Sequence, residues 1–199
     1  RVAAFGGAIA LNQECDRETA ELITRNYAEV IVAPGYGEGA LEVFATKKNL
    51  RVFQIENMQK LKTYSANRFV DFKSLMDGGL IAQWSFMPTA QSKDDLMLAT
   101  TTYKDQDYKI GREPTAREYD DLIFGWLVEA GVTSNSVLYV KDGATVGIGT
   151  GEQDRVGVAE IARDKAYTKL AERICWARHK VPYNTLEDED EKADIHQEG

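Results

Sequence analysis

The sequence contains few of the residues that build metal sites and nucleophilic triads. Its two cysteines, Cys15 and Cys175, stand far apart, outside any CxxC pair or His-rich spacing, which argues against a zinc site or a disulfide framework. We expect both to be free thiols. The two histidines are equally isolated, because His179 follows the end of a predicted helix and His196 lies in an acidic segment. No Ser-His-Asp or Cys-His arrangement can be argued from them.

Long apolar runs and an excess of positive charge are also missing. No run approaches the ~20 apolar residues of a membrane span, and no signal peptide opens the chain, so we expect a cytoplasmic protein without membrane contact. The net charge of −8 argues against a general nucleic-acid surface, although residues 187–191 and neighbouring acids supply a good part of it. With 43% apolar residues, the 199 residues are nevertheless long enough for a real core.

The stretch from Ser134 to Val156 carries the most informative local pattern. Two short runs of β-branched and aromatic residues flank Asp142-Gly143, a dipeptide suited to a turn with positive φ, and this order predicts a β-hairpin. Asp154 can then cap a long helix that extends to Arg178. The stripe of apolar residues along this helix is typical of a core-facing surface.

Three glycines, Gly147, Gly149 and Gly151, separate the predicted hairpin from this helix. Free N–H groups at a helix N-terminus beside such a backbone favour an anionic or carbonyl-rich ligand. Alternatively, the glycines only allow strand and helix to pack closely. The pattern is not a nucleotide fingerprint, because GxGxxG would require glycine at Glu152 and no Gly-Lys-Ser/Thr loop is present.

The first third of the chain reads as alternating strands and helices. We expect a buried strand over Val2–Leu11, a helix capped by Asp16 and ending near Tyr27, and a central parallel strand over Val30–Ala33. A helix over Gly39–Lys48, with Leu41 and Phe44 facing inward, and a strand over Arg51–Ile55 complete an α/β layered unit.

Later segments are less regular. Gly78–Trp84 suits one short strand, whereas Met87–Gly111 is polar and weakly periodic, as in a surface excursion or mobile loop. Helical periodicity returns over Ala116–Ala130, with Pro114 placed for the first helical position. After Leu186 acidic residues dominate, which indicates a disordered or loosely packed tail.

Several motifs of the chain, and their order along it, resemble one family. This family is the aminoimidazole carboxamide ribonucleotide (AICAR) transformylase domain of the bifunctional purine-biosynthesis protein, which also carries an IMP cyclohydrolase. The resemblance covers most of residues 4–178. It rests on the Ser134-Asn135-Ser136 motif followed by the hairpin and the glycines, and on three further stretches, namely Ala4 to Asn12, Glu29 to Tyr36, and Arg112 to Thr115 with Asp121 to Phe124.

The resemblance implies a fold and an activity. It implies a three-layer α/β/α, cytidine-deaminase-like fold with a mixed sheet, with residues 1–183 as the central part of the transformylase domain and 184–199 as an acidic tail or linker. The implied reaction transfers a formyl group from the co-substrate 10-formyltetrahydrofolate to the 5-amino group of AICAR, in a homodimeric parent protein. The family's Lys-His catalytic pair would precede Arg1, so the chain would be an excised piece, inactive alone.

The resemblance also assigns residues to the hairpin end of the site. Asn135 matches the asparagine that binds the AICAR base, Arg155 the arginine between AICAR and the folate, and Val156 a residue touching the folate ring. An amide suits a carboxamide, and a guanidinium fork suits a carboxamide or carboxylate. The alternatives are an Asn135 that only caps a turn and an Arg155 that is only solvated on a first helical turn.

Four further residues carry over from the first strands and from the motif around Asn135. By resemblance the backbone of Gly6 lies beside the nucleotide and Glu29 binds ribose hydroxyls, although Glu29 alone would read as a routine acid at a helix end. Ser134 and Ser136 match the alkali-ion (potassium) site of some family members, but strand hydroxyls are usually satisfied core groups.

This chain also departs from the family. It has Leu127, Ala130 and Thr133 where members usually carry lysines, and Glu152 in place of a glutamine. A non-catalytic nucleotide-binding or assembly module of the same fold is therefore a second hypothesis. A deaminase-like metalloenzyme has little support, because the C-x-x-C zinc ligands are missing.

Overall fold

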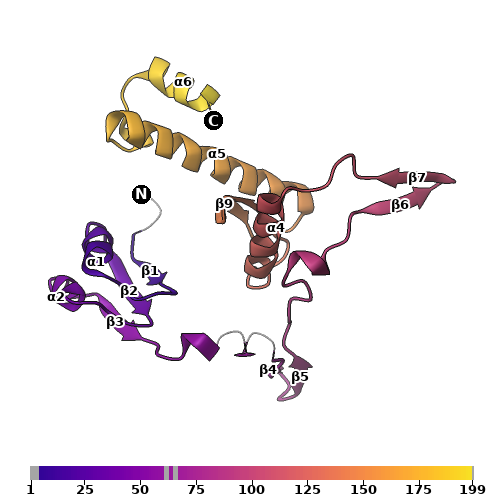
Figure 1. The fold of residues 1–199 in the computed structure, drawn as a ribbon, viewed down its shortest axis with the longest axis horizontal. Coiled ribbons are helices and arrows are strands. Elements are labelled where there is room, and N and C mark those ends of the chain that lie inside the picture. Colours follow the sequence, from indigo (N-terminus) through magenta and orange to yellow (C-terminus); the bar gives the residue numbers. More distant parts are fainter. Residues whose placement is uncertain (1–4, 61–62, 65–66, 199) are drawn as a thin grey trace. The chain divides into compact units, whose positions relative to one another are not determined.

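The computed structural model describes residues 5–60, 63–64 and 67–198, and it divides into two compact units (Figure 1). The first unit extends to Arg68 and the second begins at Phe69. Each unit has its own elements and its own packing. Together they contain parallel and antiparallel sheets with helices, so the chain is of the mixed α/β class that the sequence predicts.

The first unit is built on a three-stranded parallel sheet. Its strands are β1 (Gly7–Ala10), β2 (Ala28–Ala33) and β3 (Arg51–Gln54), in the order β1-β2-β3. The apolar run of β2 therefore forms the central strand, as predicted. Parallel neighbours require crossover connections, and α1 (Arg17–Thr24) and α2 (Ala40–Ala45) provide them.

The helices of this unit are shorter than the sequence indicated. Asp16 caps α1 as predicted, since its carboxylate accepts the Thr19 N–H at 2.8 Å, but the helix ends at Thr24. In α2, Phe44 is buried as expected, whereas Leu41 is 51% exposed and the prediction that it faces inward is wrong. The buried residues of this six-residue helix are Ala40 and Phe44, which are four apart and share one face.

One face of the sheet holds the core of the first unit. Ile31 and Ala33 of β2 are buried against Ala20 of α1 and Phe44 of α2. β1 is not the fully buried strand expected over Val2–Leu11, because its residues alternate between half-buried and exposed. This alternation follows from the period of two along a strand. Residues 2–4 of that prediction lie outside the described residues.

Two hairpins open the second unit. β4 (Val70–Ser74) pairs with β5 (Leu80–Trp84), which confirms a strand within Gly78–Trp84. β6 (Thr100–Tyr103) pairs with β7 (Gln106–Lys109), and a short helix η2 (Lys93–Asp95) precedes them. The predicted loop over Met87–Gly111 is thus partly regular structure. The turn between β6 and β7 has positive φ at Lys104 and Asp105. Neither residue is a glycine, so the glycine that usually indicates such a hairpin turn is missing from the sequence.

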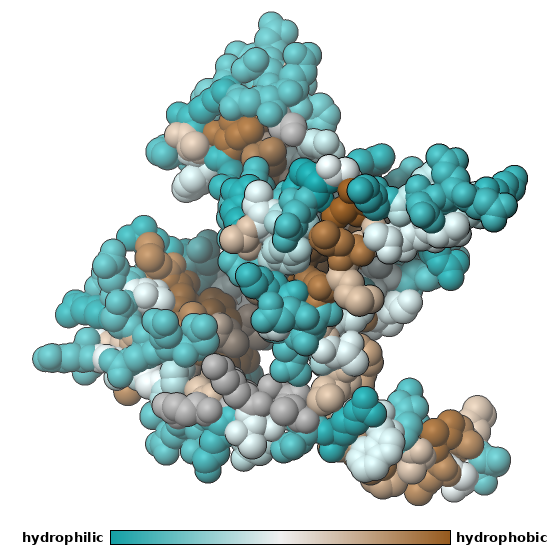
Figure 2. Space-filling view, turned by 45° about the vertical axis from the view of Figure 1, so that its right-hand side comes forward, coloured by the Kyte–Doolittle hydropathy of each residue, from teal (hydrophilic) through white to brown (hydrophobic). Residues whose placement is uncertain are grey.

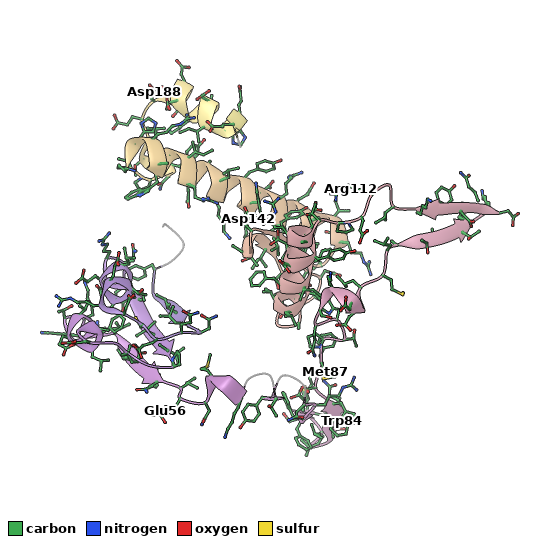
Figure 3. All side chains as sticks on the ribbon, viewed as in Figure 1. Glu56, Trp84, Met87, Arg112, Asp142 and Asp188 are labelled. Atoms are coloured by element: carbon green, nitrogen blue, oxygen red, sulfur yellow. The ribbon has the colours of Figure 1, made fainter. Side chains whose placement is uncertain are left out.

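The hairpin of β4 and β5 has one apolar face. The cross-strand pairs Val70 with Trp84 and Phe72 with Ala82 lie on this face, and Leu80 follows them. Phe72, Leu80 and Trp84 are each more than 60% exposed. A brown patch lies on this hairpin at the lower right of Figure 2, and Figure 3 labels Trp84 on the same hairpin.

A second pair of strands lies between two helices. β8 (Val137–Lys141) and β9 (Ala144–Gly149) form the predicted hairpin, with φ of 54° at Asp142 and 69° at Gly143. Helix α4 (Ala116–Glu129) packs on the face that carries Leu138 and Val140. Helix α5 (Arg155–His179) packs against the glycines on the opposite face.

Helix α4 begins at Ala116, two residues after Pro114, so the placement of Pro114 at the first helical position is wrong. Thr115 is the capping residue, and its hydroxyl accepts the N–H of Glu118. Glu118 in turn accepts the Thr115 N–H at 2.8 Å, which completes a capping box. The guanidinium of Arg112 donates to both carboxylate oxygens of Glu118, at 2.7 and 2.8 Å.

This cluster makes the stability of α4 dependent on pH. Arg112, and then the N–H and hydroxyl of Thr115, lower the pKa of Glu118 from 4.5 to about 2. A carboxylate with a lowered pKa stabilises the fold fully above its unfolded pKa and loses that contribution as pH falls towards the folded value. We expect Glu118→Gln to lower the free energy of unfolding at pH 6. This difference in unfolding free energy between wild type and variant should decrease as the pH falls from about 4.5 and should vanish near pH 2.

Urea unfolding at a series of pH values measures this difference. Glu113→Gln is the matched control, because the Glu113 side chain makes no hydrogen bond to a described residue. A wild-type to Glu118→Gln difference that stayed constant down to pH 2 would contradict the assignment.

The C-terminal segment is folded, contrary to the expected loose tail. A short helix η3 (Tyr183–Thr185) leads into α6 (Glu189–Glu198), and Ile195 is fully buried against Ala171 and Cys175 of α5. Acidic residues dominate the composition of this segment, and the prediction of a loose tail did not take its single buried apolar residue, Ile195, into account. Among the helices described, none is long and apolar enough to cross a membrane.

Candidate functional site

Gly6 and Glu29, both predicted site residues, lie side by side in the first unit. A Cβ atom on Gly6 would lie 3.1 Å from Oε1 of Glu29, and the φ of +71° at Gly6 is a backbone conformation that favours glycine. Glu29 is exposed on β2, so the alternative of a helix-end acid is wrong. An exposed carboxylate can accept hydrogen bonds from hydroxyl groups of a ligand.

Two aromatic residues complete this corner of the first unit. Tyr27 accepts the N–H of Gly6 through its backbone carbonyl at 3.2 Å, and its hydroxyl lies 3.5 Å from Oε1 of Glu29. The ring of Phe5 stacks on the ring of Tyr27 with 4.7 Å between centroids, and Phe5 is 82% exposed. Neither ring was predicted as part of the site, and only their position next to Gly6 and Glu29 in the sequence pointed to them.

Asn135 ties the start of the hairpin to the loop that follows it. Its side-chain N–H groups donate to the carbonyls of Glu152 at 3.0 Å and Gln153 at 3.2 Å. The backbones of Asn135 and Glu152 exchange two further hydrogen bonds. Both side-chain donors are therefore engaged, and the Oδ1 atom, which has no donor among the described residues, is what Asn135 can offer a ligand.

Arg155 and Val156 occupy the first turn of α5, directly after this loop. Asp154 caps the helix as predicted, because its carboxylate accepts the N–H groups of Val156 and Gly157 at 2.8 and 2.7 Å. Arg155 is exposed and makes no hydrogen bond or ion pair with any described residue. Val156 is 69% exposed. A guanidinium and an apolar side chain are thus free at the start of one helix, and only Asp154 separates them from the Glu152–Gln153 backbone that Asn135 binds.

Two of the three glycines before α5 allow strand and helix to pack closely. Gly147 and Gly149 belong to β9 itself, and Cβ atoms on them would lie 2.0 Å from the Ala162 oxygen and 2.2 Å from the Val158 oxygen of α5. The structure therefore supports the alternative of close packing at these two positions. Of the three glycines, Gly151, at φ +67°, has nothing within 4 Å of an added Cβ atom.

The serines beside Asn135 have different surroundings. Ser134 is exposed, whereas the hydroxyl of Ser136 donates to Oε1 of Glu129, at the end of α4. The other carboxylate oxygen of Glu129 is buried and has no hydrogen-bond partner in the described part of the chain. Glu129 was not singled out from the sequence, where it reads as a helix-end acid. No group of three or more His, Cys, Asp and Glu residues within the described ranges is arranged to hold a metal.

The predicted site residues thus form two sets. Gly6 and Glu29 lie in the first unit, and Asn135, Arg155 and Val156 lie in the second. Within each set the residues lie close together.

Comparison with known proteins gives a consistent answer. A family model described as AICARFT/IMPCHase bienzyme matches residues 1–165. The bifunctional purine biosynthesis protein PurH of Cereibacter sphaeroides is 41% identical over 166 residues, and that of Ruegeria sp. (strain TM1040) is 38% identical over 166 residues; both alignments cover 83% of this chain. The protein of the same name from Caldicellulosiruptor saccharolyticus is 36% identical over 163 residues, or 81% of this chain. The chain spans 28% of the length of each of these relatives. The chain belongs to the AICARFT/IMPCHase bienzyme family.

Proposed function

We propose that the protein containing this chain transfers a formyl group from 10-formyltetrahydrofolate to the 5-amino group of AICAR in purine (IMP) biosynthesis. The amine is a weak nucleophile because its electrons delocalise into the imidazole ring. The reaction therefore requires proton removal and close positioning of amine and formyl donor. In our proposal these 199 residues position both substrates, and residues elsewhere in the protein move the proton.

The observation that carries the proposal is the connection between Asn135 and the start of α5. Hydrogen bonds from Asn135 hold the backbone at Glu152 and Gln153, which only Asp154 separates from Arg155 and Val156. A group that accepts through Oδ1 is thereby fixed near a free guanidinium and an exposed apolar side chain. This combination suits a carboxamide-bearing nucleotide next to a flat, partly apolar folate.

The first unit supports the same reaction with groups for a ribose. Glu29 supplies a carboxylate acceptor for hydroxyls, and the missing side chain of Gly6 leaves room for that carboxylate. The rings of Phe5 and Tyr27 add an aromatic surface beside them. We infer that these groups bind the ribose end of AICAR.

The finer features implied by the family follow from the same proposal. They are a three-layer, deaminase-like domain, a cytoplasmic homodimer, and a potassium ion near Ser134 and Ser136. Placement of α4 and α5 on opposite faces of one hairpin supports the layered arrangement.

Substitutions of Arg155 in the full-length protein test the function. Asn135→Ala is a poor probe, because it also removes the hydrogen bonds that hold the loop. We expect Arg155→Ala to weaken binding of AICAR or of the folate by about 1–3 kcal/mol. Arg155→Lys should cost nearly as much, because a point charge cannot replace a planar fork.

Calorimetric titration with each ligand and formyl-transfer assays measure these effects. Arg163→Ala is the matched control, because Arg163 is an exposed arginine on the same helix that pairs with Asp164. If both Arg155 variants bind both ligands normally, Arg155 does not belong to the site. If the wild-type full-length protein binds AICAR without formyl transfer, the non-catalytic binding module is the correct alternative.

A further inference from the structure

Tyr27 stands where the ribose-binding groups of the first unit meet. It directly precedes β2 and lies two residues before Glu29, so the two side chains share one face of the extended backbone. The Tyr27 hydroxyl lies 3.5 Å from Oε1 of Glu29, within reach of a hydrogen bond. In the proposed function Glu29 accepts the ribose hydroxyls, whereas Tyr27 contributes only an aromatic surface. The hydroxyl of Tyr27 therefore has no role in it yet.

Two contacts fix the ring of Tyr27. Its backbone carbonyl accepts the N–H of Gly6 at 3.2 Å, which ties it to the start of β1, the strand beside β2 (Figure 1). Its ring stacks on the ring of Phe5 with 4.7 Å between centroids and 29° between planes. A tyrosine side chain has only two torsion angles, so these contacts leave it little freedom. The hydroxyl is thereby held at a defined place next to Glu29.

The carboxylate of Glu29 depends on its neighbours for its orientation. A glutamate side chain has three torsion angles, and Glu29 is exposed on β2. Gly6 leaves room beside Oε1, because a Cβ atom on Gly6 would lie 3.1 Å from it. Among the described residues, Tyr27 supplies the one hydrogen-bond donor to this carboxylate. The remaining lone pairs of the carboxylate can accept the two adjacent hydroxyls of a ribose.

We propose that Tyr27 is a positioning residue, whose hydroxyl donates to Oε1 of Glu29, orients the carboxylate towards the ribose, and so favours ribonucleotides over 2′-deoxyribonucleotides. This role rests on the proposed function, because it requires that Glu29 receives the ribose of AICAR. A ligand without the 2′-hydroxyl leaves one acceptor of the carboxylate unpaired. An oriented carboxylate loses more by this than a rotating one, which can turn to water instead. Tyr27 thus acts on ribose selection through Glu29.

Calorimetric titration of the full-length protein with AICAR and with its 2′-deoxyribose analogue tests this role. Tyr27→Phe removes the hydroxyl but keeps the ring on Phe5 and the backbone bond to Gly6. We expect wild type to bind AICAR about tenfold more tightly than the analogue, and Tyr27→Phe to reduce that preference about threefold by weakening AICAR binding. In formyl-transfer assays the KM for AICAR should rise by the same factor, with kcat unchanged. An unchanged preference in a variant of normal thermal stability would overturn the proposal.

A second variant shows whether Tyr27 acts through Glu29. In a Glu29→Ala background, Tyr27→Phe should have no further effect on AICAR binding, whereas an equal loss in both backgrounds would contradict the proposed coupling. Tyr108→Phe is the matched control, because the exposed Tyr108 hydroxyl also bonds to a side chain two residues away, Oε1 of Gln106 at 3.1 Å. It should leave the ribose preference at the wild-type value. A wild-type protein that binds no AICAR would overturn the proposed function and this role together, whereas normal AICAR binding with an unchanged preference in Tyr27→Phe would overturn only the role of Tyr27.

Discussion

Gly147→Ala should destabilise the protein by about 3 kcal/mol or more, because no room exists for a methyl group between β9 and α5. The new Cβ atom would lie 2.0 Å from the carbonyl oxygen of Ala162 and 3.1 Å from the Cβ of Ala166. The first contact is with helix backbone, which cannot rotate away as a flexible side chain can. Strand and helix must separate, and the buried contacts of Val158 and Ala162 would loosen with them.

Urea unfolding of the 199-residue chain checks this result. Gly149→Ala should behave similarly, since its Cβ atom would lie 2.2 Å from the Val158 oxygen. Gly111→Ala is the matched control, because nothing lies within 4 Å of its added Cβ atom. We expect the control to change the free energy of unfolding by less than about 0.5 kcal/mol. Wild-type stability of Gly147→Ala would show that α5 does not pack on β9 in this way.

These glycines show what local sequence signals can predict. The hairpin and the caps of α1 and α5 depend on neighbouring residues, namely Asp142-Gly143, Asp16 and Asp154, and the structure confirms all three. The purpose of Gly147 and Gly149 depends on which surface lies opposite, and that surface belongs to a helix that begins several residues later. Sequence spacing left packing and ligand binding both open, and the structure favours packing.

The incorrect predictions for α5 and α6 also arise because burial depends on contacts between elements, which the local sequence does not show. The prediction of a core stripe along α5 was only partly correct, since Val158 is buried but Tyr167 is 47% exposed. The residues that α5 does bury towards its end, Ala171 and Cys175, are covered by α6, an element whose acidic composition suggested disorder. Tertiary contacts of a single isoleucine thus outweighed the local composition.

The residues of the candidate site were predicted from the resemblance to a family. Neither composition nor periodicity selects Gly6, Glu29, Asn135 or Arg155. The structure places Gly6 against Glu29, and Asn135 against the loop before Arg155, by contacts between residues far apart in sequence. Glu129 and Phe5 have no sequence pattern of their own, and only burial and ring stacking reveal them.

Helix α6 is held to α5 by one apolar anchor and a surrounding set of ion pairs. Ile195 is fully buried, and Tyr183 and Leu186 pack around it. Arg178 forms ion pairs with Glu191, Asp194 and Glu198, and His179 lies 3.0 Å from Glu191. Exposed ion pairs are worth little individually, whereas a buried isoleucine typically contributes several times more. The isoleucine should therefore dominate the docking of this helix.

We expect Ile195→Ala to destabilise the C-terminal part of α5 by about 2–4 kcal/mol, and truncation at Asn184 to cost at least as much. This reverses the expectation from sequence that the tail contributes little to folding. Amide hydrogen exchange at residues 171–179, together with thermal unfolding, measures the effect. Ile110→Ala is the matched control, because Ile110 is 38% exposed and should lose much less.

High salt separates the two contributions to docking. Salt screens the pairs around Arg178 but leaves burial of Ile195 intact, so 0.5 M sodium chloride should lower the protection of residues 171–179 far less than Ile195→Ala does. If salt alone released the helix while Ile195→Ala left exchange unchanged, charge and not burial would hold α6. In that case truncation at Asn184 would change the melting temperature only at low ionic strength, because the lost contacts would be electrostatic.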